Sequence, residues 1–204
     1  SGSSLTSLEA QKLAHKKASQ VFDDPVLWRM APIADRDALE MGLDSKWVEN
    51  DKSACWFFWY ADPDGEDWFM IGIKGEEIVY SDIGTRGSAM PMDAAWARES
   101  TEISLKAAAA AARKSGADLE SLTFAEYNVK QYIGSKLTPA WVLTFSQSLD
   151  SGLNLNYRMF VDPVTGKVLM ALNERHEDLS LPLDLKALGE KKSIVIAPKP
   201  VTGL

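Results

Sequence analysis

The alternation of apolar and polar residues along the chain predicts two helices and eight strands. Residues 6–22 carry an apolar stripe at helical spacing, and they begin with Thr6 and Glu9 placed as a capping box. A second helix is predicted within 92–116 and ends at Gly116, a favoured residue after a helix C-cap. Turn residues bound the runs that are typical of strands. These runs cover residues 26–33, 54–60, 68–73, 78–81, 121–129, 140–149, 153–161 and 168–172.

Both halves of the chain follow one plan, a helix and then an antiparallel meander. One strand of each half matches at an offset of 85 positions, through Trp56, Phe58 and Tyr60 with Trp141, Leu143 and Phe145. The following strand matches at an offset of 89, through Trp68, Met70 and Ile71 with Tyr157, Met159 and Phe160. A helix on one face of an antiparallel sheet is α+β architecture. The sequence therefore predicts an α+β fold of two tandem helix-plus-antiparallel-sheet units in two layers.

The predicted domain boundaries follow from this repeat. Residues 1–5 form a tether, and residues 6–81 form the first unit. A glycine-containing connection, "DIGTRGSAMP", occupies residues 82–91 and leads into the second unit at 92–172. The C-terminal segment 173–204 is expected to pack on the two units.

The run "CWFFWY" at residues 55–60 is apolar at every position, although a half-buried strand needs only every second residue apolar. Trp56, Phe58 and Tyr60 have large counterparts in the second half, so we expect them under the helix. The opposite face carries Cys55, Phe57 and Trp59. Their counterparts are the smaller residues Ala140, Val142 and Thr144.

The first unit therefore has an additional apolar surface, which we predict to be a partner-binding site. At the offset of 89, Phe69 stands where the second unit has Arg158, so Phe69 is expected beside Phe57 and Trp59. Three occupants of this surface are open at this stage. It is covered by the second unit or by a C-terminal segment (181–185 or 193–198), by a protein partner or dimer mate, or by a small apolar ligand.

Composition and charge narrow the classes of partner. The chain has 204 residues, is 46% hydrophobic and 25% charged, and carries a net charge of −7. An acidic chain without a basic stripe disfavours nucleic acids and anionic membrane surfaces as partners. The single cysteine, Cys55, excludes an internal disulfide and a metal site built on cysteines. We expect it to be a buried apolar residue.

No motif for catalysis is present in the sequence. The chain lacks a glycine-rich phosphate loop and a nucleophile elbow. Its two histidines, His15 and His176, do not stand at metal-ligand spacing, and a metal at Glu174, His176 and Asp178 is disfavoured. We therefore predict no catalytic residue, no metal, no cofactor and no enzymatic activity.

Three segments within residues 103–172 resemble the PepSY domain family. They are "ISLKAAAAAARKSGADL", "AWVLTF" and "YRMFVDPVTGKVL". The residues that stand in the family's places are Ser104, Asp162, Pro163, Thr165, Gly166 and Lys167. The match is weaker over residues 6–81, where "DPDGED" and "KGEE" replace the expected turns. The tandem arrangement is also similar to the two-repeat architecture of secreted β-lactamase inhibitor proteins.

The resemblance implies a noncatalytic module of the bacterial envelope or of secreted proteins that acts by inhibition or protein binding. The family has no agreed catalytic residues, so none is carried over. The start "SGSSLTS" fits a tether after a removed leader or a lipidated cysteine, and an expression scar fits equally. We predict an extracytoplasmic module that binds a protein partner, with membrane contact only through a lipid anchor outside this chain. The alternative is a protein that binds a small apolar or peptidoglycan-derived ligand in a closed cavity.

Overall fold

The structure is a computed structural model that describes residues 5–33, 52–53, 55–62, 67–85, 101–133 and 136–196. The predicted connection at 82–91 is wrong over residues 82–85, which continue a strand, and its remaining residues lie outside the described residues. So do the first part of the predicted second helix, the tether residues 1–4, and residues 197–204.

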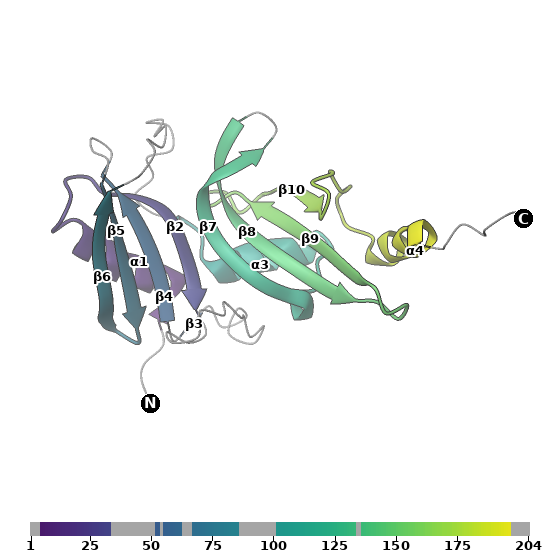
Figure 1. Cartoon of the computed structure of the whole chain (residues 1–204), viewed down its shortest axis with the longest axis horizontal. Helices are drawn as coiled ribbons and strands as arrows, with labels where there is room; N and C mark the ends of the chain where they lie inside the picture. The colour runs from purple at the N-terminus through teal and green to yellow at the C-terminus, as the bar shows by residue number, and fades with distance from the viewer. Residues whose placement is uncertain are drawn as a thin grey trace, which may run out of the picture.

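One antiparallel sheet of eight strands forms the main layer, in the order β10-β9-β8-β7-β2-β4-β5-β6 (Figure 1). Its strands are β2 (Val26–Ile33), β4 (Cys55–Ala61), β5 (Asp67–Lys74), β6 (Glu77–Thr85), β7 (Leu122–Ile133), β8 (Lys136–Ser148), β9 (Asn154–Val161) and β10 (Val168–Asn173). They correspond to the eight predicted runs. The two-residue strands β1 (Leu5–Thr6) and β3 (Lys52–Ser53) pair separately.

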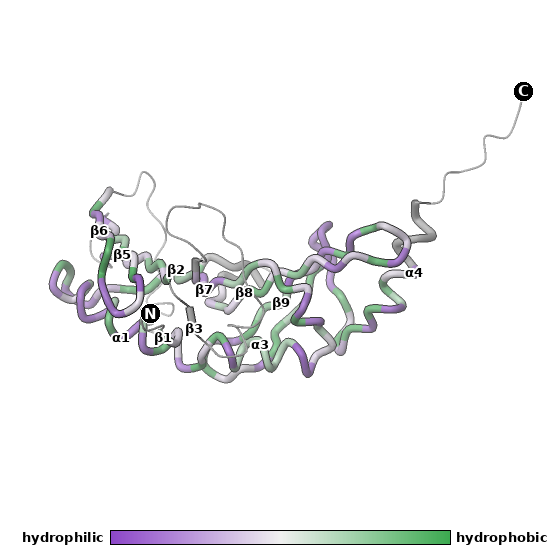
Figure 2. The backbone as a smooth tube through the Cα atoms, turned by 90° about the horizontal axis from the view of Figure 1, so that it is seen from below, coloured by the Kyte–Doolittle hydropathy of each residue, from purple (hydrophilic) through white to green (hydrophobic). Residues whose placement is uncertain are grey.

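Two helices lie on one face of this sheet, so the predicted α+β class is confirmed (Figure 2). Helix α1 (Ser7–Ala18) packs on β4 and β5, and helix α3 (Leu105–Lys114) packs on β8 and β9. A third helix, α4 (Leu185–Ile196), lies near the C-terminal end of the chain. Among the described residues, no helix is both long and apolar enough to cross a membrane.

Local hydrogen bonds explain where the two sheet-covering helices begin. Thr6 Oγ1 accepts from the Glu9 backbone N–H at 3.2 Å, and Glu9 Oε2 accepts from the Thr6 N–H at 2.9 Å, which is the predicted capping box. At α3, Ser104 Oγ accepts from the Ala107 N–H at 3.1 Å. Helix α1 ends at Ala18, before the predicted end at residue 22, because the chain then forms turns.

The order of a helix followed by four antiparallel strands occurs in each half, and the first of these strands, β2 and β7, lie side by side. Two residue pairs join them, Arg29 with Asn128 and Met30 with Tyr127. The sheet therefore continues from one half into the other. The boundaries proposed for two PepSY-like units remain a prediction.

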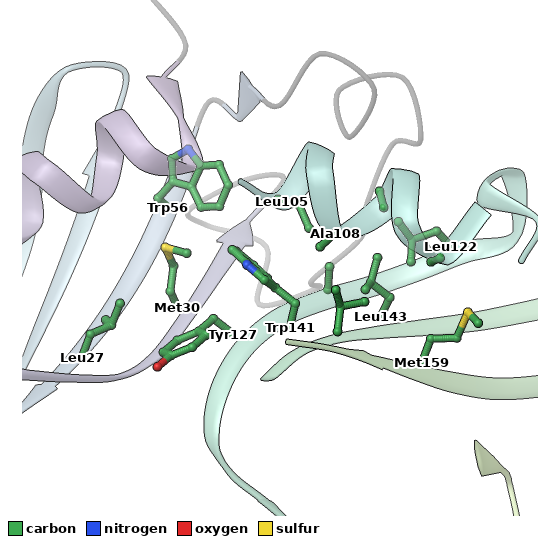
Figure 3. Packing of buried hydrophobic residues seen from close by; sticks show 14 of the residues in the cluster. Leu27, Met30, Trp56, Leu105, Ala108, Leu122, Tyr127, Trp141, Leu143 and Met159 are labelled. Carbon is green, nitrogen blue, oxygen red and sulfur yellow. The ribbon is translucent and has the colours of Figure 1, made fainter. Parts of the chain in front are cut away.

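A single apolar core fills the space between the helices and the sheet (Figure 3). Trp56 and Trp141 are fully buried there, as is Leu105 at the start of α3. The buried positions of the two helices are mostly alanines: Ala10, Ala14, Ala18, Ala108, Ala109 and Ala112. Their small side chains let the helices approach the large aromatic residues of the strands closely.

A buried polar connection joins the two halves on the helix side. Gln11 Nε2 donates to Thr101 Oγ1 at 2.6 Å, and Gln11 Oε1 accepts from the Thr101 N–H at 2.9 Å. Ser7 Oγ accepts from the Leu105 N–H at 3.0 Å. A side chain of α1 therefore satisfies a backbone donor in the first turn of α3, where donors lack helical partners.

The "DPVTGK" hairpin between β9 and β10 adopts the predicted turn. Asp162 Oδ1 accepts from the N–H groups of Val164 and Thr165, and Gly166 has φ of +73°. The carbonyl of Pro163 also accepts from the Ile103 N–H at 3.1 Å, directly before α3. This turn therefore fastens the last hairpin to the start of the helix.

The C-terminal segment packs beside the end of α3. The Leu183 N–H donates to the Ser115 carbonyl at 2.8 Å, and Leu183 is buried in the helix-side core. Residues 181–185 therefore do not cover Phe57 and Trp59, as one of the sequence alternatives required. Residues 197–198 of the other candidate segment lie outside the described residues.

Candidate functional site

The strand pairing defines which residues share the face of the sheet opposite the helices, which we call the open face. Phe58 pairs with Ile71 and Met30, and all three are buried under the helices. Trp59 pairs with Met70 on one side and Arg29 on the other, so these three residues lie on the open face. The predicted division of "CWFFWY" between the two faces is therefore correct.

The predicted placement of Phe69 on the open face is wrong. Phe69 pairs with Tyr60 on the helix side, is 3% exposed, and makes an edge contact with Phe22 at a centroid distance of 6.4 Å. It is a core residue, and its inclusion in a partner-binding site is withdrawn.

The cause of this error is a slip of one residue in the comparison of the two halves. Trp56 pairs with Ile73, and Trp141 pairs with Val161, so β5 and β9 correspond at an offset of 88 (from 73 to 161). The sequence comparison used 89. A one-residue slip exchanges the two faces of a strand.

Four aromatic residues form a row across the open face of the first half, which we call the aromatic cluster: Trp28, Phe57, Trp59 and Tyr80. Centroid distances along the row are 6.2 Å from Trp28 to Trp59, 5.7 Å from Trp59 to Phe57, and 5.9 Å from Phe57 to Tyr80. Each member is half-buried, so part of each ring remains accessible. The row joins strands β2, β4 and β6.

A cation and two acids adjoin the aromatic cluster. The Arg29 guanidinium carbon lies 4.6 Å from the centroid of a Trp59 ring, a cation–π contact. Arg29 Nε also donates to Glu126 Oε2 at 2.6 Å, which joins β2 to β7 on the open face. At the other end of the row, Tyr80 Oη donates to Asp82 Oδ2 at 3.4 Å. The cluster therefore combines apolar rings with a polar margin.

Two glycines leave space for aromatic rings on the open face. A Cβ at Gly72 would lie 3.3 Å from the Phe57 ring, and a Cβ at Gly84 would lie 2.2 Å from the Trp68 ring. The rings of Phe57 and Trp68 therefore rest directly on glycine backbone. A side chain at either glycine would displace the ring above it.

The structure places Cys55 and His176, the other residues considered for chemistry, in different surroundings. Cys55 is buried and is not part of a disulfide. His176 lies in an exposed turn with φ of +60°, and its Nδ1 contacts Arg158. Within the described ranges, no group of three potential metal-binding side chains lies together.

Hollows lined by described residues open at the surface in both halves. One, of about 190 Å³, lies on the open face of the second half, and its lining is Thr144, Asn156, Tyr157, Arg158, Asn173, Glu174 and His176. Another, of about 460 Å³, follows α1, and its lining is His15, Ser19, Phe22, Asp23, Asp24 and Pro25. Neither is a closed cavity, between helix and sheet or between the two units, of the kind that the small-ligand alternative predicted.

Sequence reasoning missed Trp28, Arg29 and Tyr80 as neighbours of Trp59. Register irregularities between Leu27 and Arg29, and between Gly72 and Ile73, break the simple alternation of faces. The usable signal was that Trp28, Arg29 and Tyr80 all stand in predicted strands. The pairing of Tyr80 with Gly72, opposite Phe57, was not readable from one sequence.

The comparisons with known proteins give a likeness of fold. No family model matches the chain, and no curated protein matches it. The chain is similar to the crystal structure of a putative lipoprotein from Clostridium difficile 630, with a TM-score of 0.52 and 10% sequence identity. The match covers 83% of this chain and 93% of that one. At this identity the likeness concerns the fold alone.

Proposed function

We propose that the protein is a noncatalytic, extracytoplasmic module that binds another protein and inhibits or regulates it. The observation that carries this proposal is the half-buried aromatic cluster around Phe57 and Trp59 on the open face. The matching residues of the second half, Val142 and Thr144, bear no aromatic ring. Aromatic residues beside an arginine are characteristic of the residues that contribute most to protein–protein binding.

The proposal includes two tandem PepSY-like units as the scaffold. It is supported by the recurrence of a helix followed by four antiparallel strands. The "DPVTGK" turn fastened to the start of α3 supplies a structural role for the residues that resemble the PepSY family. The extracytoplasmic location draws on the resemblance and on the fold likeness to a putative lipoprotein.

The test is a capture experiment with the purified chain against envelope and secreted fractions of the organism that encodes it. Wild type, Trp59→Ala and Leu8→Ser are compared, and circular dichroism establishes that each is folded. Leu8 is the control because it is a 40% exposed apolar residue on α1, away from the open face. We expect one protein to be retained by wild type and Leu8→Ser and lost by Trp59→Ala.

Two outcomes would contradict the proposal. Retention by all three variants would place the binding surface elsewhere. Collapse of Trp59→Ala would make Trp59 a residue of the core rather than of an interface, and Trp59→Phe then serves to separate the roles. A captured protease that loses activity on binding would identify the inhibitory form of the function.

A small apolar or peptidoglycan-derived ligand is the second candidate. The row of accessible rings next to Asp82 favours it, because sugars and apolar groups pack on ring faces while polar margins bind hydroxyls. Tryptophan fluorescence titration with soluble peptidoglycan fragments tests it. A saturable change lost in Trp59→Ala, without any captured protein, would favour this candidate over the first.

A further inference from the structure

The side chain of Arg158 is held by neighbouring residues but has no acidic partner among the described residues. It lies on the open face of β9 between Thr144 and Leu172, its neighbours on the adjoining strands. Its guanidinium carbon is 5.6 Å from the centroid of the buried Phe160 ring. Among the described residues, Arg158 forms no ion pair with a carboxylate. A half-buried cation that has no carboxylate partner favours the binding of an anionic ligand.

A tight turn orients this guanidinium. Arg158 Nη2 lies 2.9 Å from His176 Nδ1, and arginine can only donate, so Nδ1 accepts and the imidazole proton resides on Nε2. Asn173 Oδ1 accepts from the N–H groups of Arg175 and Glu177, which fixes the turn that carries His176. One guanidinium N–H is therefore engaged, and the others remain for a ligand.

The guanidinium belongs to the wall of the hollow of about 190 Å³ on this face. Thr144, Asn156 and Asn173 line the same hollow, and the amides of Asn156 and Asn173 are already bonded to Glu174 and within the turn. The volume suits a small charged group rather than a whole cofactor. Arginine presents a planar fork of donors that matches the two oxygens of a carboxylate.

Glu174 limits which anions fit. Its Oε2 accepts from Asn156 Nδ2 at 3.2 Å, and it lines the same hollow as Arg158. A phosphate dianion would face more repulsion from this carboxylate than a singly charged ligand does. The arrangement therefore favours a carboxylate over a phosphate.

We propose that the hollow around Arg158 is a carboxylate-binding site that receives an acidic side chain or the chain end of a protein partner. This site is independent of the aromatic cluster. Arg158 on β9 and Trp59 on β4 are four strand spacings apart, roughly 19 Å at about 4.8 Å per spacing. One partner that occupied both would place apolar residues on the first half and a carboxylate on the second.

The test follows the Nε–H resonance of Arg158 by nuclear magnetic resonance in the whole chain. The probes are N-acetylglycine, a short glutamate-rich peptide and inorganic phosphate. We expect N-acetylglycine and the peptide to shift this resonance saturably, with phosphate binding more weakly. Tighter binding of the peptide than of N-acetylglycine would assign the site to a protein partner, and equal binding would assign it to free small carboxylates.

Matched variants test whether the guanidinium of Arg158 binds the carboxylate. Arg158→Gln is expected to weaken carboxylate binding at least about tenfold, the loss that accompanies removal of a charge-assisted hydrogen bond. Arg175→Gln is the control, because Arg175 is an exposed arginine of the same turn that does not line the hollow. Glu174→Gln is expected to tighten binding, since it removes a repelling charge.

Three results would contradict the proposal of a carboxylate site at Arg158. They are the absence of a saturable shift of the Arg158 resonance with either carboxylate, tighter binding of phosphate, and an equal loss in Arg158→Gln and Arg175→Gln. If Arg158→Gln fails to fold, Arg158→Lys keeps the charge and removes the fork. Undiminished binding by that lysine variant would equally contradict the proposal. Loss of capture in Trp59→Ala leaves this titration unaffected, so the two proposals fail separately.

Discussion

Trp56 and Trp141 make the same hydrogen bond in the two halves of the molecule. Trp56 Nε1 donates to the Leu5 carbonyl at 3.1 Å, and Trp141 Nε1 donates to the Ile103 carbonyl at 3.2 Å. Each carbonyl belongs to the residue directly before a helix N-cap. Each buried indole therefore fixes the start of a helix to the strand beneath it.

Replacement of either indole by phenylalanine is expected to lower the free energy of unfolding by about 1 kcal/mol or more, because the hydrogen bond from the buried indole to the carbonyl before the helix is lost. Urea unfolding of Trp56→Phe and Trp141→Phe measures this. Trp59→Phe on the open face is the control, with a smaller expected change, because Trp59 is only half-buried. Equal losses in all three variants would mean that ring size, and not the hydrogen bond, matters.

The buried pair Gln11 and Thr101 is expected to couple the two halves energetically. Each residue is 3% exposed, and two hydrogen bonds join them. A double-mutant cycle with Gln11→Ala and Thr101→Ala should give a coupling free energy of about 0.5–3 kcal/mol. Urea unfolding supplies the four stabilities. Strictly additive losses would show that the bonds contribute nothing beyond the separate side chains.

Gly116 is expected to tolerate substitution far less than Gly152. Both have positive φ, +96° and +77°. A Cβ at Gly116 would lie 2.5 Å from the Leu183 carbonyl oxygen, whereas a Cβ at Gly152 has nothing within 4 Å. Gly152→Ala should cost about 1–2 kcal/mol from backbone strain alone. Gly116→Ala should cost clearly more in the same thermal unfolding measurement, and similar losses would contradict the steric argument.

Much of the fold was predictable because hydrophobic periodicity, caps and turn residues each determine structure locally. The eight strands, the capping box at Thr6 and the "DPVTGK" turn are all present, although β6, β7 and β8 are longer than the runs that predicted them. The helix-side burial of Trp56 followed from its match with Trp141. These features depend on residues near in sequence or on a repeated pattern.

The candidate site was predictable only in part, because it depends on pairing between distant strands. Trp59 was found from its own strand, but Phe69 was misplaced when β5 was compared with β9 one residue out of step. Arg158 was read as the counterpart of Phe69, whereas at the corrected offset it corresponds to Met70. The hollow around Arg158 is formed in part by the turn that carries His176, and no sequence pattern indicates that this turn lies beside Arg158.

Two tyrosines under the helices are expected to make the fold sensitive to high pH. Burial raises the pKa of Tyr157 to about 12, although the N–H of Asp118 donates to its hydroxyl and lowers the pKa in part. Burial, and then the charge of neighbouring Tyr127, raise the pKa of Tyr60 further. The neutral hydroxyl is therefore the form that the folded state favours.

The direction of the pH effect follows from these shifts. An unfolded chain loses tyrosine protons near pH 10, whereas folded Tyr157 retains its proton until about pH 12. The folded state then binds more protons, so the free energy of unfolding is constant with respect to these groups below about pH 10 and falls as the pH rises from there. Urea midpoints across this range, with tyrosinate absorbance followed in parallel, measure the fall. Tyr157→Phe should show a shallower slope between about pH 10 and pH 12, and an unchanged slope would show that Tyr157 ionises freely in the folded protein.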